Sequence, residues 1–67
     1  MEKIANELAD MINAGMTTSE IENEMAKRAI ADKDWLDFRS AYLCWGADDP
    51  EWLEKYVEEK GTKPLRR

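Results

Sequence analysis

The three glycines of this chain divide it into segments with helical patterns. Gly15, Gly46 and Gly61 each follow a segment whose apolar residues recur at the three- and four-residue intervals that align side chains on one face of an α-helix. Glycine is common just past the end of a helix because it adopts left-handed backbone conformations at little steric cost. No segment alternates apolar with polar residues, and no Asn-Gly or Asp-Gly hairpin turn occurs. The sequence therefore predicts helices and no strands.

Polar residues mark where these helices begin. Thr17 and Glu20 have the spacing of a capping box, which predicts a helix from about Thr18 to Ala31. Asp32 or Asp34 can cap the next helix. In the last segment, Asp49 followed by Pro50 predicts another start, because proline lacks only an amide hydrogen that would have no partner there. We therefore predict an all-α fold, a small compact bundle of three to four short helices.

Chain length limits the fold to one small core. A chain of 67 residues buries only about 60 % of its surface, so packing alone barely stabilises it. Cys44 is the single cysteine and histidine is absent, so we expect neither an internal disulfide nor a zinc site. We predict a single helical domain over residues 1–61 and a short basic C-terminal tail over residues 62–67 that frays.

The acidic composition narrows the range of partners. Charged residues make up 37 % of the chain and the net charge is −5, which favours solubility and disfavours attraction to nucleic acid or anionic lipid. The apolar runs are too short to span a bilayer, and the N-terminus lacks the apolar region of a secretory signal. We therefore expect a cytoplasmic protein that does not bind membranes.

The residue patterns of catalytic sites are missing. Cys44 has no histidine to produce a thiolate, and its neighbours Leu43 and Trp45 suggest a small buried side chain. Asp48 and Asp49 stand at a predicted helix start, where capping explains them. The glycines lie at helix ends, so no glycine-rich phosphate loop is present. We expect no enzyme activity, no cofactor and no metal.

All six aromatic residues lie between positions 35 and 56. Their helical spacing predicts that most of them form the core. Three tryptophans nevertheless exceed what the few apolar residues of the first two helices can cover, and tryptophan is enriched among the residues that dominate protein interfaces. We therefore predict a partner-binding face around the last interhelical link, made of Trp45, Asp48, Asp49, Glu51, Trp52 and Tyr56.

These features predict a small acidic protein that acts by binding another protein, as an adaptor or an inhibitor. A homodimer is the simplest way to bury an apolar stripe that is wider than the core of a single copy can enclose. Six acids between Asp48 and Glu59 could also imitate nucleic-acid phosphates and block a nucleic-acid-processing enzyme. Small acidic helical proteins of this kind are common among phage-encoded inhibitors, so a phage origin is part of the hypothesis.

The segment NAGMTTSEIENEM, residues 13–25, resembles the first half of a helix-turn-helix unit of the type found in recombinases and small regulators. The resemblance implies a second tight turn and then a recognition helix that carries cationic or amide side chains to the bases. The segment that follows here, DKDWLDFRSAYLCW, is acidic and aromatic, and only Lys33 and Arg39 could contact phosphates. A helix-turn-helix-like DNA-binding regulator is therefore the alternative function.

Overall fold

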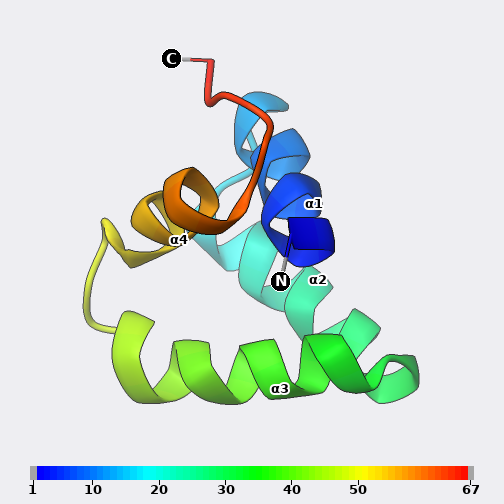
Figure 1. The fold of residues 1–67 in the computed structure, drawn as a ribbon. Coiled ribbons are helices and arrows are strands. Elements are labelled where there is room, and N and C mark those ends of the chain that lie inside the picture. Colours follow the sequence, from blue (N-terminus) through cyan, green and yellow to red (C-terminus); the bar gives the residue numbers. More distant parts are fainter. Residues whose placement is uncertain (1, 67) are drawn as a thin grey trace.

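Helices make up the fold of this protein in a computed structural model, which describes residues 2–66 (Figure 1). Met1 of the predicted domain and Arg67 of the predicted tail lie outside the described residues. A π-helix, η1, continues the third of four α-helices, and the elements are α1 (Glu2–Asn13), α2 (Thr18–Ala31), α3 (Lys33–Ala41), η1 (Tyr42–Gly46) and α4 (Trp52–Lys60). No strand occurs in the described part of the chain, so the predicted all-α bundle is confirmed.

The predicted capping box sets the start of α2. Thr17 Oγ1 accepts a hydrogen bond from the Glu20 amide at 3.2 Å, and Glu20 Oε1 accepts one from the Thr17 amide at 2.8 Å. The bond from the Thr17 amide stabilises the carboxylate and lowers the pKa of Glu20. Gly15, at the end of the preceding turn, has a φ of 83°, which glycine adopts at little cost. Both signals place the α1–α2 turn where the sequence predicts it.

A single residue, Asp32, joins α2 to α3. Its amide donates to the Arg28 carbonyl at the end of α2, and its side chain accepts from the Asp34 amide at the start of α3. Asp32 also pairs with Lys3 of α1 at 3.0 Å, and this contact lowers the pKa of the Asp32 carboxyl. Asp32 rather than Asp34 is therefore the cap, and it ties the corner to α1.

The start of α4 differs from the prediction. Asp49 Oδ1 accepts from the Glu51 amide at 2.9 Å, and the Asp49 carbonyl accepts from the Trp52 amide at 3.2 Å. Residues Pro50 and Glu51 therefore form a turn, and the α-helix begins at Trp52. The Asp-Pro pair marks the start correctly to within two residues, but Asp49 caps the turn rather than the helix itself.

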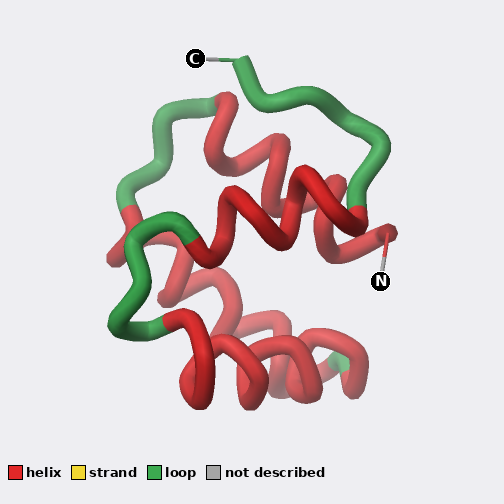
Figure 2. Tube along the Cα trace, turned by 60° about the vertical axis from the view of Figure 1, so that its left-hand side comes forward, coloured by secondary structure: helices red, strands yellow, loops and turns green. Residues whose placement is uncertain are grey.

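Residues 62–66 do not fray, so that prediction is wrong. They return alongside α1 (Figures 1 and 2), where polar side chains on one face of the helix bind them. Those side chains are Asn6, Asp10 and Asn13. The amides of Thr62 and Arg66 donate to the two asparagines at 2.8 and 2.6 Å, and Lys63 pairs with the aspartate at 2.9 Å. The division into a domain and a tail stays a prediction.

The core fills the space between two pairs of neighbouring helices, α2 with α3 and α1 with α4. Its buried side chains come from every helix, and the larger ones are Ile4, Leu8, Met11, Ile21, Met25, Trp35, Phe38, Tyr42, Leu53 and Val57. Trp52 and Tyr56 are half-buried and pack against this core. The prediction that most of the aromatic rings belong to the core is therefore confirmed, and Trp45 is the exception.

Candidate functional site: an exposed aromatic turn

The end of the third helix is held by close packing of η1 against α4. The Ala47 amide donates to the Tyr42 carbonyl at 2.9 Å, the five-residue reach that defines a π-turn. Gly46 lies directly against the Trp52 indole, since a Cβ on Gly46 would stand 2.5 Å from two ring carbons. The helical segment ends at Gly46 as predicted, but the reason is this close approach and not a left-handed backbone.

This anchoring turns three consecutive side chains outward, which we call the aromatic turn: Leu43, Cys44 and Trp45. Trp45 is 76 % exposed and Leu43 is 54 % exposed. Cys44 is exposed as well, so the prediction of a buried thiol is wrong. Tyr42 and Gly46 take the inward positions on either side, which leaves the three residues between them to solvent.

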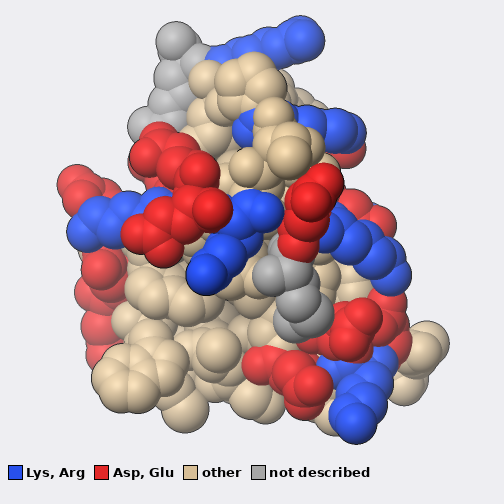
Figure 3. All heavy atoms as spheres, viewed as in Figure 1, with Lys and Arg blue, Asp and Glu red and all other residues tan. Residues whose placement is uncertain are grey.

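An acidic link follows the aromatic turn and contains Asp48, Asp49 and Glu51. Asp48 is exposed and makes no hydrogen bond or ion pair within residues 2–66. Glu51 pairs only loosely with Lys55, at 3.8 Å, and both side chains are largely in solvent. Figure 3 shows acidic side chains along the left edge of the molecule over this link, and below them an uncharged surface over the η1 end of the third helix, whereas charged side chains lie over the other end of α3. An apolar projection with an acidic border is the result.

The remaining predicted site residues, Trp52 and Tyr56, lie in an aromatic cluster. Their rings stack with centroids 5.6 Å apart, and Phe38 contacts both at 5.7 and 4.8 Å. Burial raises the pKa of the Tyr56 hydroxyl. Trp45 makes no ring contact with any aromatic residue in the described part of the chain. Trp45 therefore lies apart from this cluster, and a partner contact for Trp45, Trp52 and Tyr56 stays a prediction.

Sequence reasoning missed Leu43 and Cys44 as surface residues. The inward stripe runs through Trp35, Phe38 and Tyr42, and its next member could be Trp45, three residues on, or Gly46, four residues on. The sequence predicts Trp45 as a partner-facing residue but Cys44 as a buried thiol, so it does not predict the exposed turn of three residues. A glycine four residues after a buried tyrosine was the available signal, because it leaves room for a large ring from another helix.

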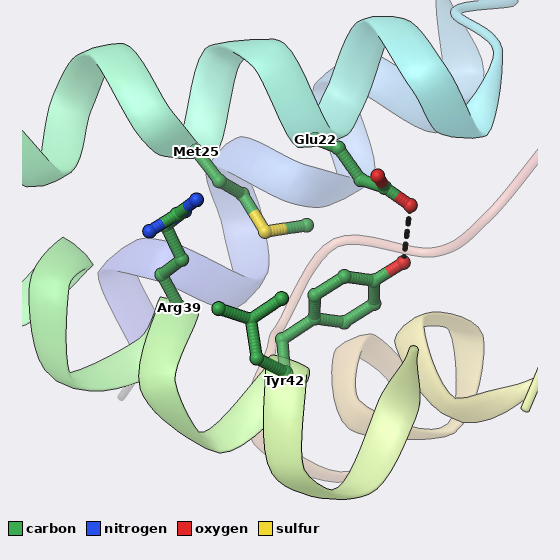
Figure 4. Close-up of a pocket in the computed structure, with 5 residues that line it drawn as sticks. Glu22, Met25, Arg39 and Tyr42 are labelled. Carbon is green, nitrogen blue, oxygen red and sulfur yellow. Dashed lines mark hydrogen bonds between the residues drawn. The ribbon is translucent and has the colours of Figure 1, made fainter. Parts of the chain in front are cut away.

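A small hollow beside the aromatic turn does not hold a ligand. Its walls are Glu22, Met25, Arg39, Tyr42 and Leu43, and its volume of about 40 Å³ admits only a few water molecules (Figure 4). Within it the Tyr42 hydroxyl donates to Glu22 Oε1 at 2.8 Å. Burial, together with this negative neighbour, raises the pKa of Tyr42 to about 12. The Tyr42–Glu22 hydrogen bond thus joins α2 to η1 beside the hollow.

Alkaline pH is expected to weaken the fold through Tyr42. The folded state holds the phenol proton up to about pH 12, whereas an unfolded tyrosine loses it near pH 10, so stability is full below pH 10 and falls toward pH 12. Urea unfolding followed by circular dichroism at pH 8 and pH 11 measures the loss. In the Tyr42→Phe control the part of the loss due to this group disappears; an equal loss in that variant contradicts the assignment.

The described residues offer little support for other kinds of site. No group of three potential metal ligands lies together in residues 2–66, and none of their helices is long and apolar enough to cross a membrane. The α2–α3 corner is one residue, whereas a helix-turn-helix joins its helices through roughly three to four. DNA binding through α3 stays a prediction, with Lys33 exposed and Arg39 lining the hollow of Tyr42.

Comparison of the chain with known protein families, with curated proteins and with solved structures gave no match. The class is therefore defined by fold and surface: a small all-α protein with an exposed aromatic turn followed by an acidic link.

Proposed function

We propose that this protein acts by binding another protein through the aromatic turn. The observation that supports the proposal is the exposure of Trp45, 76 %, on a backbone that Gly46 and Trp52 hold in place. Covering an exposed tryptophan with a partner contributes a large favourable free energy of binding, and such residues dominate many interfaces. A backbone that is already ordered lowers the entropy cost of association.

The acidic link would govern which partners approach. Its carboxylates beside the aromatic turn, together with the net charge of −5, favour encounter with basic protein surfaces and disfavour acidic ones. This suits an adaptor or an inhibitor, including an inhibitor that occupies a basic cleft of a nucleic-acid-processing enzyme. A cytoplasmic setting belongs to the same proposal, since an exposed unpaired thiol at Cys44 is compatible with a reducing compartment.

Trp45→Ala is expected to weaken association by at least roughly tenfold, the effect of losing one dominant interface residue. The matched control is Ile30→Ala, because Ile30 is 87 % exposed in the last turn of α2, next to the α2–α3 corner and therefore at the other end of α3 from the aromatic turn. Self-association is measured by sedimentation, and binding of other proteins by capture on the immobilised chain from a lysate of the source cells. Equal behaviour of both variants in both measurements contradicts the proposal.

A further inference from the structure

One face of α1 binds the backbone of residues 62–66. Asn6, Asp10 and Asn13 stand four and three residues apart, which places them in one row along the helix, and we call them the polar stripe. Asn6 Oδ1 accepts hydrogen bonds from two successive amides, from Thr62 at 2.8 Å and from Lys63 at 3.2 Å. Every residue except proline offers such an amide, so these two bonds do not depend on the identity of the side chains.

Asn13 binds the other end of the segment in the same way. Its Nδ2 donates to the Pro64 carbonyl at 3.1 Å, and its Oδ1 accepts from the Arg66 amide at 2.6 Å. Between the two asparagines, Asp10 pairs with the Lys63 ammonium at 2.9 Å. The polar stripe thus binds a non-helical segment through four backbone groups and one cationic side chain.

The tail leaves part of this site unfilled. A hollow of about 460 Å³ lies between α1 and the tail, within the range of about 300–1,000 Å³ that is usual for ligand pockets. Its walls are Asp10, Asn13 and Ala14 on one side and Lys63, Pro64 and Arg66 on the other. The hydrogen bonds between tail and stripe are exposed to solvent, and contacts of this kind open at a small cost in free energy. The site therefore has room for a segment bulkier than the tail.

We infer that the polar stripe is a binding site for a non-helical, lysine-containing segment of a partner protein, and that the chain's own tail occupies it until such a segment displaces it. The asparagines bind the partner's backbone, Asp10 selects its lysine, and the hollow receives a side chain larger than that of Pro64. A basic segment also suits the net charge of −5. This site goes beyond the proposed function, because α1 and the tail lie at the top of the molecule and the third helix lies along the bottom (Figures 1 and 2).

Binding of a peptide in trans tests the site on the full chain. The double variant Thr62→Pro, Lys63→Glu removes the first amide donor and places a carboxylate against Asp10, so the tail is released while α1 is unchanged. The peptide GTKPLR, residues 61–66, is added at up to about 5 mM, because a tethered segment competes at a millimolar effective concentration. Nuclear magnetic resonance follows the side-chain amides of Asn6 and Asn13.

Both asparagine signals of the released-tail variant are expected to shift when the peptide is added. Half-saturation should need at least about threefold less peptide than in the wild type, whose own tail competes. Both substituted residues are exposed, so circular dichroism should show unchanged helicity. Equal half-saturation in the two proteins, or no shift in the variant, overturns the site.

Charge exchange tests the role of Asp10 separately. The single variant Asp10→Lys repels the tail and should bind the same peptide with glutamate in place of its lysine about two- to fivefold more tightly than GTKPLR, the range for one exposed ion pair. The released-tail variant should show the opposite order, and the same order in both proteins contradicts the selection by Asp10. Adding Trp45→Ala to the released-tail variant should leave peptide binding unchanged. A loss would place the peptide on the aromatic turn and overturn the separate site, while the proposed function would stand.

Discussion

Trp35→Ala is expected to lower the free energy of unfolding by about 3–5 kcal/mol, which is typical of a large ring removed from a core. The indole is only 2 % exposed, packs edge-on against Phe38 with centroids 5.9 Å apart, and donates to Glu7 Oε2 at 3.1 Å. Arg28 lies over the ring at 5.1 Å. A domain of this size has a total stability of about 3–10 kcal/mol, so much of the variant should be unfolded at room temperature.

The matched control is the same substitution at the exposed tryptophan. Trp45→Ala removes an identical side chain from a position without core contacts, so its unfolding free energy should stay within about 0.5 kcal/mol of the wild type. Urea unfolding followed by circular dichroism compares the two. Similar losses in both variants would mean that Trp45 is part of the core, and the aromatic turn would then not be a free surface.

Local signals in the sequence predict most of the helix boundaries. Thr17 with Glu20 places the start of α2 correctly because capping depends on residues within one turn. The docked tail was not predictable in this way, since Thr62 bonds to Asn6 across 56 positions of the chain. No local pattern in the sequence records that contact. The polar stripe of α1 is visible in the sequence, but what it binds is not.

The candidate site was predictable only in part, for the same reason. Trp45 and the acids of the link were recognised from residue type and position at a helix end. Trp52 lies under Gly46, and this contact between two elements decides that residues 43–45 face outward. The pattern of apolar residues indicates that one aromatic ring stays outside the core, but the packing of two helices decides which ring this is.

Gly46→Ala is expected to destabilise the protein by about 1–3 kcal/mol, the range for inserting a methyl group into a packed core. Alanine in place of glycine in a helical segment ordinarily stabilises it by about 1 kcal/mol, so the expected sign is reversed. The reason is the Trp52 ring, two of whose carbons would lie 2.5 Å from the new Cβ. Urea unfolding gives the free-energy change, and an unchanged or raised stability would contradict this packing.

The Trp52→Ala background separates the clash from any effect on the backbone. With the indole gone, the three atoms nearest to the new methyl group are removed, so Gly46→Ala should become neutral or stabilising by up to about 1 kcal/mol. The difference between the two backgrounds is the coupling between Gly46 and Trp52. Since this contact orients η1, the single Gly46→Ala variant should also displace the aromatic turn and weaken association, whereas the Trp45→Ala variant weakens association without loss of stability. The two substitutions, one residue apart, thereby distinguish the residue that makes the contact from the residue that positions it.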